Sequence, residues 1–150
     1  MTIHKVEPKL LTEDYIIFNK PLYLNEVEIQ TEQENIVLSE CMPIFNEKLK
    51  WLNSDECKDN LIDKFYKFVN SYSEKKITVE EITNNKWYEN LEPQGAIIYI
   101  PSDFNKMRFT IHCVDKWHNL YVEIEDNKII SVDDEYVDPE HGLGYNGIWK

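Results

Sequence analysis

The chain has few of the residues on which cofactor and nucleic-acid sites commonly depend. Of its 150 residues only four are glycine, three are cysteine and one, Arg108, is arginine. Three of the glycines lie between residues 142 and 147, where no helix is expected to follow them. Glycine-rich loops that bind dinucleotides or nucleoside triphosphates are therefore absent. Because lysine and arginine are not clustered, we expect no contact with nucleic acid or with an anionic membrane surface.

The cysteines and the hydrophobic runs indicate the cellular compartment of the protein. Cys41, Cys57 and Cys113 are odd in number and widely spaced, which predicts three reduced, buried thiols. No apolar run approaches the roughly 18 residues of a membrane-spanning helix. The first eight residues lack the apolar segment of a secretory signal. We therefore expect a cytoplasmic protein.

The residues that bind metals or catalyse reactions show no established spacing. His112, Cys113, His118 and His141 form neither a CxxC nor an HxxxH motif, and neighbouring residues of a strand point to opposite faces. The acidic segment 133–142 does not place glycine and glutamate where a calcium loop requires them. No serine or cysteine has a nucleophile signature. We predict no metal site, cofactor or catalytic residue, and a binding protein rather than an enzyme.

The composition, with 42% hydrophobic residues, supports a single domain over residues 1–150. The first part of the chain favours strands. An apolar run at 15–18 ends at a turn signal at 19–21, and apolar and polar residues alternate at 27–30. Residues 36–38 predict another short strand.

The middle of the chain predicts helices. Ser39 is expected to cap the first helix, with Pro43 in its first turn, and Ser54 to cap the second. Residues 78–81 resemble a capping box and indicate one further short helix. The second helix has an apolar stripe at helical spacing, formed by Leu61, Phe65, Phe68, Val69 and Tyr72.

The last third predicts a series of strands. Residues 96–100 are continuously apolar, which is typical of a central strand, whereas 107–113 and 120–125 alternate. Asp126-Asn127 has the chemistry of a type I′ hairpin turn. We therefore predict the α+β class, with an antiparallel hairpin and meander in the C-terminal half and the middle helices packed on one face. The helical stripe should pack on Phe109, Ile111, Val122 and Ile124.

Negative charge is concentrated at the end of the chain. Residues 115–150 contain nine acidic and three basic residues, half of the net charge of −12, whereas 41–90 is nearly neutral. Such asymmetry indicates a basic protein partner, or otherwise a surface that only maintains solubility. From about residue 133 we expect an acidic, solvated tail. The predicted partner-binding residues are Trp117, His118, Tyr121, Glu123, Glu125, Asp133, Asp134 and Glu135.

Within this set Tyr121, Glu123 and Glu125 are expected to be exposed on one sheet face, with Trp117 at its rim. The two glutamates would lie about 6.5 Å apart along the strand, a spacing that acid–base chemistry tolerates. On an exposed face both would stay ionised, because nothing in the sequence supplies the desolvation that raises a carboxyl pKa. A tryptophan at a loop tip is a common interface anchor, although it can equally fold back over the sheet edge.

Three segments carry a family resemblance: residues 23–29 (YLNEVEI), 91–97 (LEPxxAI) and 113–120 (CVDKWHNL). Together with the helical middle, they resemble small bacterial domains of unknown function, some of which occur near polymorphic-toxin loci. In that family the third segment tends to be Trp-Asp-x-Glu-His-Gly-Leu. Here Trp117 replaces the glutamate and Asn119 the glycine, and the resemblance brings no catalytic residue.

The resemblance implies a non-enzymatic protein-binding module of the bacterial immunity type, since many immunity proteins are acidic and bind basic toxins. Two alternatives stay open. One is an enzyme or small-ligand-binding α+β domain with a pocket between sheet and helices. The other is a structural or phage-derived accessory protein that associates with its own copies. The sequence leaves the oligomeric state undetermined.

Overall fold

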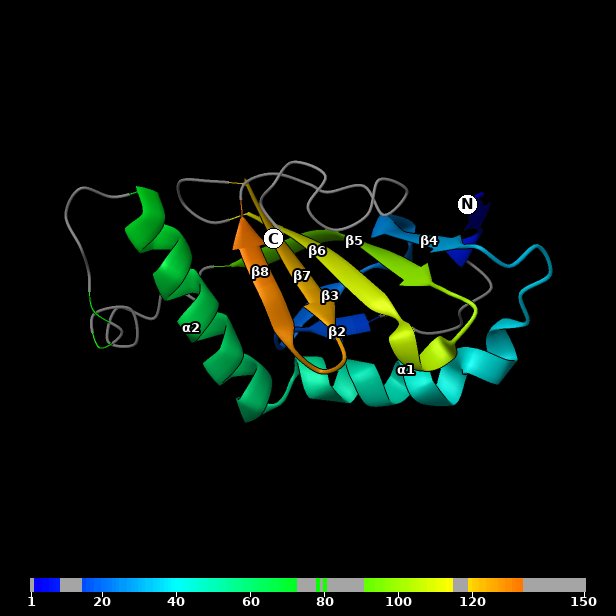
Figure 1. Cartoon of the computed structure of the whole chain (residues 1–150), viewed down its shortest axis with the longest axis horizontal. Coiled ribbons are helices and arrows are strands. Elements are labelled where there is room, and N and C mark those ends of the chain that lie inside the picture. Colours follow the sequence, from blue (N-terminus) through cyan, green and yellow to red (C-terminus); the bar gives the residue numbers. More distant parts are fainter. Residues whose placement is uncertain are drawn as a thin grey trace.

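The computed structural model describes residues 2–8, 15–72, 78, 80, 91–114 and 119–133. The elements follow one another in the order shown in Figure 1. They are β1 (His4–Val6), β2 (Tyr15–Ile17), β3 (Lys20–Leu22), the 3₁₀ turn η2 (Leu24–Glu26), β4 (Val27–Thr31), α1 (Leu38–Leu52), α2 (Asp55–Tyr72), β5 (Glu92–Ile100), the 3₁₀ turn η4 (Phe104–Lys106), β6 (Arg108–Val114), β7 (Asn119–Glu125) and β8 (Ile129–Asp133).

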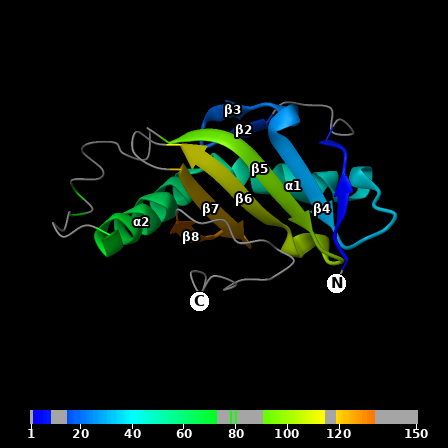
Figure 2. The same cartoon turned by 90° about the horizontal axis from the view of Figure 1, so that it is seen from above.

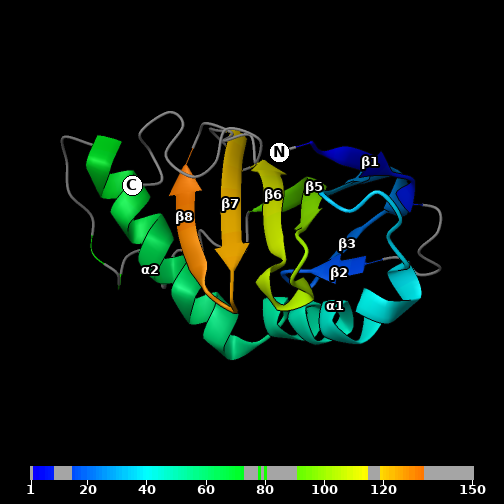
Figure 3. The same ribbon diagram turned by 45° about the vertical axis from the view of Figure 1, so that its right-hand side comes forward.

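The main sheet has six strands in the order β1-β4-β5-β6-β7-β8, and β2 pairs with β3 in a separate hairpin. Only β4 and β5 run parallel, because both helices lie in the chain between them; the other pairs are antiparallel. The meander from β5 to β8 lies side by side in Figure 3. The predicted α+β class is confirmed, as is the internal position of β5.

Both helices lie on one side of the main sheet (Figure 2). Phe45 of α1 stacks on Phe109 of β6 with ring centroids 5.9 Å apart. Phe65 and Phe68 of α2 are buried as predicted, but α2 runs beside β8 at the sheet edge. The prediction that the stripe of α2 covers the middle of β6 and β7 was thus incomplete, because α1 supplies Phe45 there. One buried cluster joins side chains of both helices and both sheets.

The two helix starts differ from each other in how well the sequence predicted them. Ser54 caps α2 as expected, and its hydroxyl accepts a hydrogen bond from the Cys57 backbone N–H at 3.1 Å. The cap predicted at Ser39 was wrong: α1 begins at Leu38, and its N-cap residue Val37 makes no side-chain hydrogen bond. Pro43 is consequently the sixth helical residue, past the first turn.

Two short predictions near the N-terminus were also wrong. Residues 36–38 form no strand, because Leu38 already belongs to α1. The turn expected at 19–21 lies one residue earlier, at Phe18 and Asn19, whose φ angles are 54° and 61°. The turn predicted at Asp126-Asn127 is confirmed, with φ of 53° at both residues.

The cysteines are three buried free thiols, in agreement with the prediction. Burial raises the pKa of Cys57 and of Cys113 to about 12. No helix in the described part of the chain is long and apolar enough to cross a membrane. The capping box predicted at 78–81 falls outside the described residues.

Candidate binding surfaces

The sheet has a second face, opposite the helices, which we call the outer face. Side chains alternate along each strand, so the strand registers place the outer-face residues in three rows. The rows, from β4 or β5 across to β7 or β8, are Glu28, Ile97, Thr110, Glu123 and Ser131; Gln30, Tyr99, Arg108 and Glu125; and Gly95, His112, Tyr121 and Asp133. This face carries all four of the predicted binding residues that the structure describes, Tyr121, Glu123, Glu125 and Asp133.

A polar network occupies the middle of the outer face. Nε of Arg108 lies 2.8 Å from Oε1 of Glu123, and the Thr110 hydroxyl donates to Oε2 of the same carboxyl group at 2.5 Å. The guanidinium of Arg108 lies over the Tyr99 ring, 5.3 Å from its centroid. The Tyr99 hydroxyl in turn donates to the carboxylate of Glu32. The network therefore connects β5, β6 and β7 by side chains as well as by backbone hydrogen bonds.

Glu123 is the largest departure from the sequence analysis. It was expected to be exposed and ionised, but it is only 2% exposed. Desolvation by burial raises its pKa to about 7, against the opposing effects of the Thr110 hydrogen bond and the Arg108 charge. Two side chains of β6 contact its carboxyl group: Thr110 lies directly opposite Glu123, and Arg108 lies one row away. Strand alternation assigned the face correctly but could not show these neighbours.

A groove of about 360 Å³ lies on the outer face beside this network. Three of its lining residues, Gly95, Ala96 and Ile97, are consecutive in β5. Its remaining lining residues are Glu26, Glu28, Thr110, His112 and Tyr121. Two glutamates from the β4 side and two aromatic rings from β6 and β7 thus line the groove, a composition that suits a cationic group with an apolar or planar body.

The two rings of the groove are stacked on each other. His112 and Tyr121 have ring centroids 4.9 Å apart and an interplanar angle of 19°. Nε2 of His112 lies 3.2 Å from Oδ1 of Asn119, which steadies the imidazole. The neighbouring Cys113 points to the opposite, buried face, as strand geometry predicts. Within the described residues no three histidine, cysteine, aspartate or glutamate side chains come together as a metal site.

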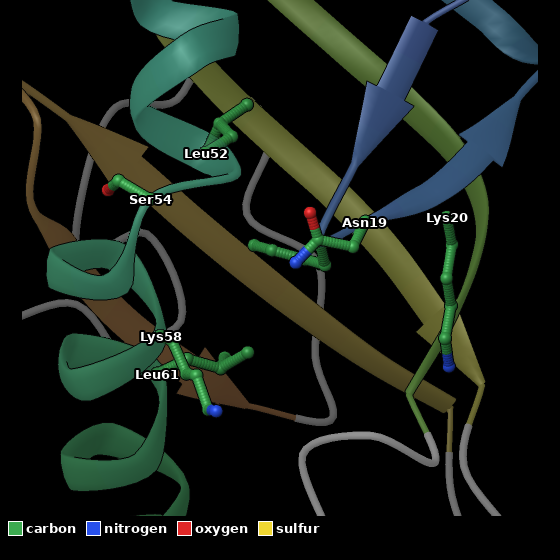
Figure 4. A pocket seen from close by; sticks show the side chains of 7 residues that line it. Asn19, Lys20, Leu52, Ser54, Lys58 and Leu61 are labelled. Atoms are coloured by element: carbon green, nitrogen blue, oxygen red, sulfur yellow. The ribbon is translucent and has the colours of Figure 1, made fainter.

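A second cavity lies between the β2–β3 hairpin and the corner where α1 ends and α2 begins (Figure 4). Its volume is about 390 Å³, within the range of small-ligand sites. Phe18, Leu52 and Leu61 form its apolar lining. Asn19, Lys20, Ser54 and Lys58 form its polar lining, so both charged residues are lysines. We call this cavity the hairpin pocket.

The tip of the hairpin beside that pocket is attached to the end of α1 by the side chain of Asn53. Its Oδ1 accepts from the Asn19 backbone N–H at 2.8 Å. Its Nδ2 donates to the carbonyl oxygens of Ile16 at 2.7 Å and Leu49 at 3.1 Å. Left-handed backbone is unusual for a bulky residue such as Phe18, so we infer that these hydrogen bonds help to maintain the tip conformation.

The structure brings only part of the predicted binding set together. Tyr121, Glu123, Glu125 and Asp133 share the outer face, with Tyr121 and Glu125 partly exposed. The predictions for Trp117, His118, Asp134 and Glu135 lie outside the described residues.

Sequence reasoning missed Glu26, Glu28 and Gly95, which lie far along the chain from the acidic end. It also missed Arg108 and Thr110 as partners of Glu123. For these two a signal existed, because the short connection between Val114 and Asn119 sets the register that places Thr110 opposite Glu123. No protein-family model, curated protein sequence or solved structure matches this chain.

Proposed function

We propose that the chain is a non-enzymatic, cytoplasmic binding module of the immunity type, which recognises a basic protein with the outer face of its sheet. The groove is the observation that carries this proposal: Glu26 and Glu28 border it beside the His112–Tyr121 stack. A net charge of −12 adds long-range attraction for a basic partner. The family resemblance of the sequence points to the same class of protein.

The burial of Glu123 favours binding over catalysis at the outer face. The carboxyl group of Glu123 has a perturbed pKa, which often marks catalytic residues. However, it is buried beneath the surface, where it contacts Arg108 and Thr110. We therefore assign Glu123 a structural role, with the exposed carboxylate of Glu26 facing the partner.

The test is recovery of partners from the native host on the immobilised chain. Glu26→Lys should weaken recovery of basic proteins, and the attraction should fade as the Debye length falls from about 10 Å at 0.1 M salt to about 3 Å at 1 M. Asp59→Lys is the matched control, since it makes the same charge change at an exposed position of α2. If Glu26→Lys recovers the same partners at the same strength, or if no partner is basic, the acidic surface serves only solubility.

A second candidate function is the binding of a small organic anion in the hairpin pocket. Its volume and its apolar lining beside Lys58 favour an anion with an apolar body, whereas Lys20 is already paired with Glu92 at 3.1 Å. A thermal-shift comparison of 3-phenylpropionate with its uncharged amide tests this. Stabilisation by the acid alone, reduced in Lys58→Gln, would support ligand binding; equal responses to both compounds would exclude an anion site.

A further inference from the structure

One of the residues that line the groove is a glycine, Gly95. Gly95 of β5 lies opposite His112 of β6, which in turn lies opposite Tyr121 of β7. A Cβ atom at Gly95 would come within 3.1 Å of the Glu26 carbonyl oxygen. Across β5, β6 and β7, this row therefore holds a glycine without a side chain, then an imidazole, then a phenol. The space above Gly95 is bordered by the imidazole, whose ring is already stacked on Tyr121.

The acidic side of the groove contains two carboxylates with different surroundings. Glu28 forms an ion pair with Lys5 at 2.6 Å and accepts from the Gln30 side chain at 3.2 Å. Glu26 is exposed, and within the described residues it has no ion pair. A cation above Gly95 would thus lie beside the aromatic stack and close to Glu26, whose side chain is exposed.

The outer face already contains one arrangement of this kind. The guanidinium of Arg108 lies over the Tyr99 ring while its Nε pairs with the carboxyl group of Glu123. Ring and carboxyl group together stabilise a planar cation, since guanidinium stacks on aromatic faces and donates hydrogen bonds in its own plane. The described residues that line the groove include the same two kinds of partner and no lysine or arginine.

We infer that the groove is a receptor for one guanidinium group, supplied by an arginine side chain of the basic partner. This inference rests on the proposed function. The guanidinium would stack on His112 from the side of Gly95 and donate hydrogen bonds to the carboxylate of Glu26. Lysine is the poorer occupant, because its ammonium is more strongly hydrated and cannot stack.

The experiment uses small probes, so that it does not depend on knowing the partner. N-acetyl-arginine-N-methylamide is titrated into the labelled protein while the ring signals of His112 and Tyr121 are followed by NMR. The citrulline compound is the matched control, because it has nearly the same shape and no charge. The lysine compound has the charge without the planar group.

We expect saturable shifts of both rings with the arginine probe and binding weaker by about tenfold or more with the other two, as loss of an interaction worth ~1.4 kcal/mol would give. Glu26→Gln should weaken the arginine probe similarly, whereas Asp59→Asn on α2 should not. Equal binding of citrulline or lysine, or an arginine response that ignores Glu26→Gln, would overturn the guanidinium site.

The outcome separates this inference from the proposed function. If the arginine probe leaves both rings unchanged while Glu26→Lys still weakens capture of a basic partner, only the guanidinium site is wrong. If the probe binds as expected and no basic partner depends on Glu26, the site stands and the proposed function fails.

Discussion

Arg108 and Glu123 form an ion pair inside the outer face, with Nε 2.8 Å from Oε1 and side chains only 12% and 2% exposed. Neither of these two atoms has a hydrogen bond of good geometry, so their contact is electrostatic rather than a directed hydrogen bond. Such a pair compensates incompletely for the desolvation of the carboxyl group. The pKa of Glu123 near 7 is the measurable consequence.

That raised pKa predicts how stability depends on pH. The usual pKa is 4.5, so between pH 4.5 and pH 7 the folded protein binds the proton of Glu123 more tightly than the unfolded chain does. This contribution to stability is therefore complete below pH 4.5, falls as pH rises and is lost above pH 7. Its size is about 3 kcal/mol.

The matched variant is Glu123→Gln, which keeps the shape of the side chain but cannot titrate. Denaturant unfolding at pH 5 and pH 8 should show a smaller loss of stability with rising pH in the variant than in the wild type. Identical slopes for the two proteins would show that Glu123 has an ordinary pKa.

Substitution of Phe65 tests how much α2 contributes to the stability of the core. Its side chain is 2% exposed within the main buried cluster. Replacement by alanine should lower the free energy of unfolding by about 3–5 kcal/mol, as for other buried phenylalanines. Asp59→Ala, at an exposed position of the same helix, should change it by less than about 0.5 kcal/mol. A loss well below 1 kcal/mol for Phe65→Ala would show that α2 contributes little to the core.

Substitution of Asn53 tests how the β2–β3 hairpin is attached to the end of α1. Asn53→Ala removes three hydrogen bonds, to Asn19, Ile16 and Leu49, and should cost about 1–3 kcal/mol. Hydrogen exchange at the Asn19 amide should accelerate more than exchange in β6. Asn60→Ala is the control, because Asn60 makes one local hydrogen bond to the Glu56 carbonyl. Equal effects of the two substitutions would argue against a special role of Asn53 at the tip.

The three cysteines predict the number of free thiols that a titration should detect. Because Cys41, Cys57 and Cys113 are free and buried, titration of the unfolded protein without reductant should detect three thiols. In the folded protein the raised pKa values and the burial of Cys57 and Cys113 should make alkylation slow at neutral pH. A count of one in the unfolded protein would reveal a disulfide.

Periodicity was sufficient to predict the elements that depend on local pattern. The alternation around Phe109 and Val122 identified β6 and β7, and Ser54 identified the start of α2. The N-terminal hairpin was predicted with the wrong turn, because Phe18 is a poor residue for left-handed backbone and its support comes from Asn53. A contact between segments so far apart in sequence leaves no local pattern.

The outer face and its groove were predictable only in part for the same reason. Tyr121 and Glu125 were assigned to the correct face, since the alternation of one strand is sufficient for that. The groove requires Glu26 and Gly95, which meet only because β4 and β5 pair in parallel across the helical part of the chain. The uneven distribution of charge along the sequence pointed to the C-terminal third. The glutamates that line the groove instead come from the first third of the chain.

The parallel pairing of β4 with β5 also has a consequence for the order of folding. Val27 pairs with Ala96, so β4 cannot join the sheet until α1, α2 and β5 have all been synthesised. The antiparallel strands from β5 to β8 are neighbours in sequence and close only short loops, which is entropically cheaper. On the ribosome, β4 is therefore synthesised well before β5, the strand with which it pairs. Its apolar strand residues, such as Val27 and Ile29, stay unprotected during that interval, and chaperones would be most useful to this chain at that stage.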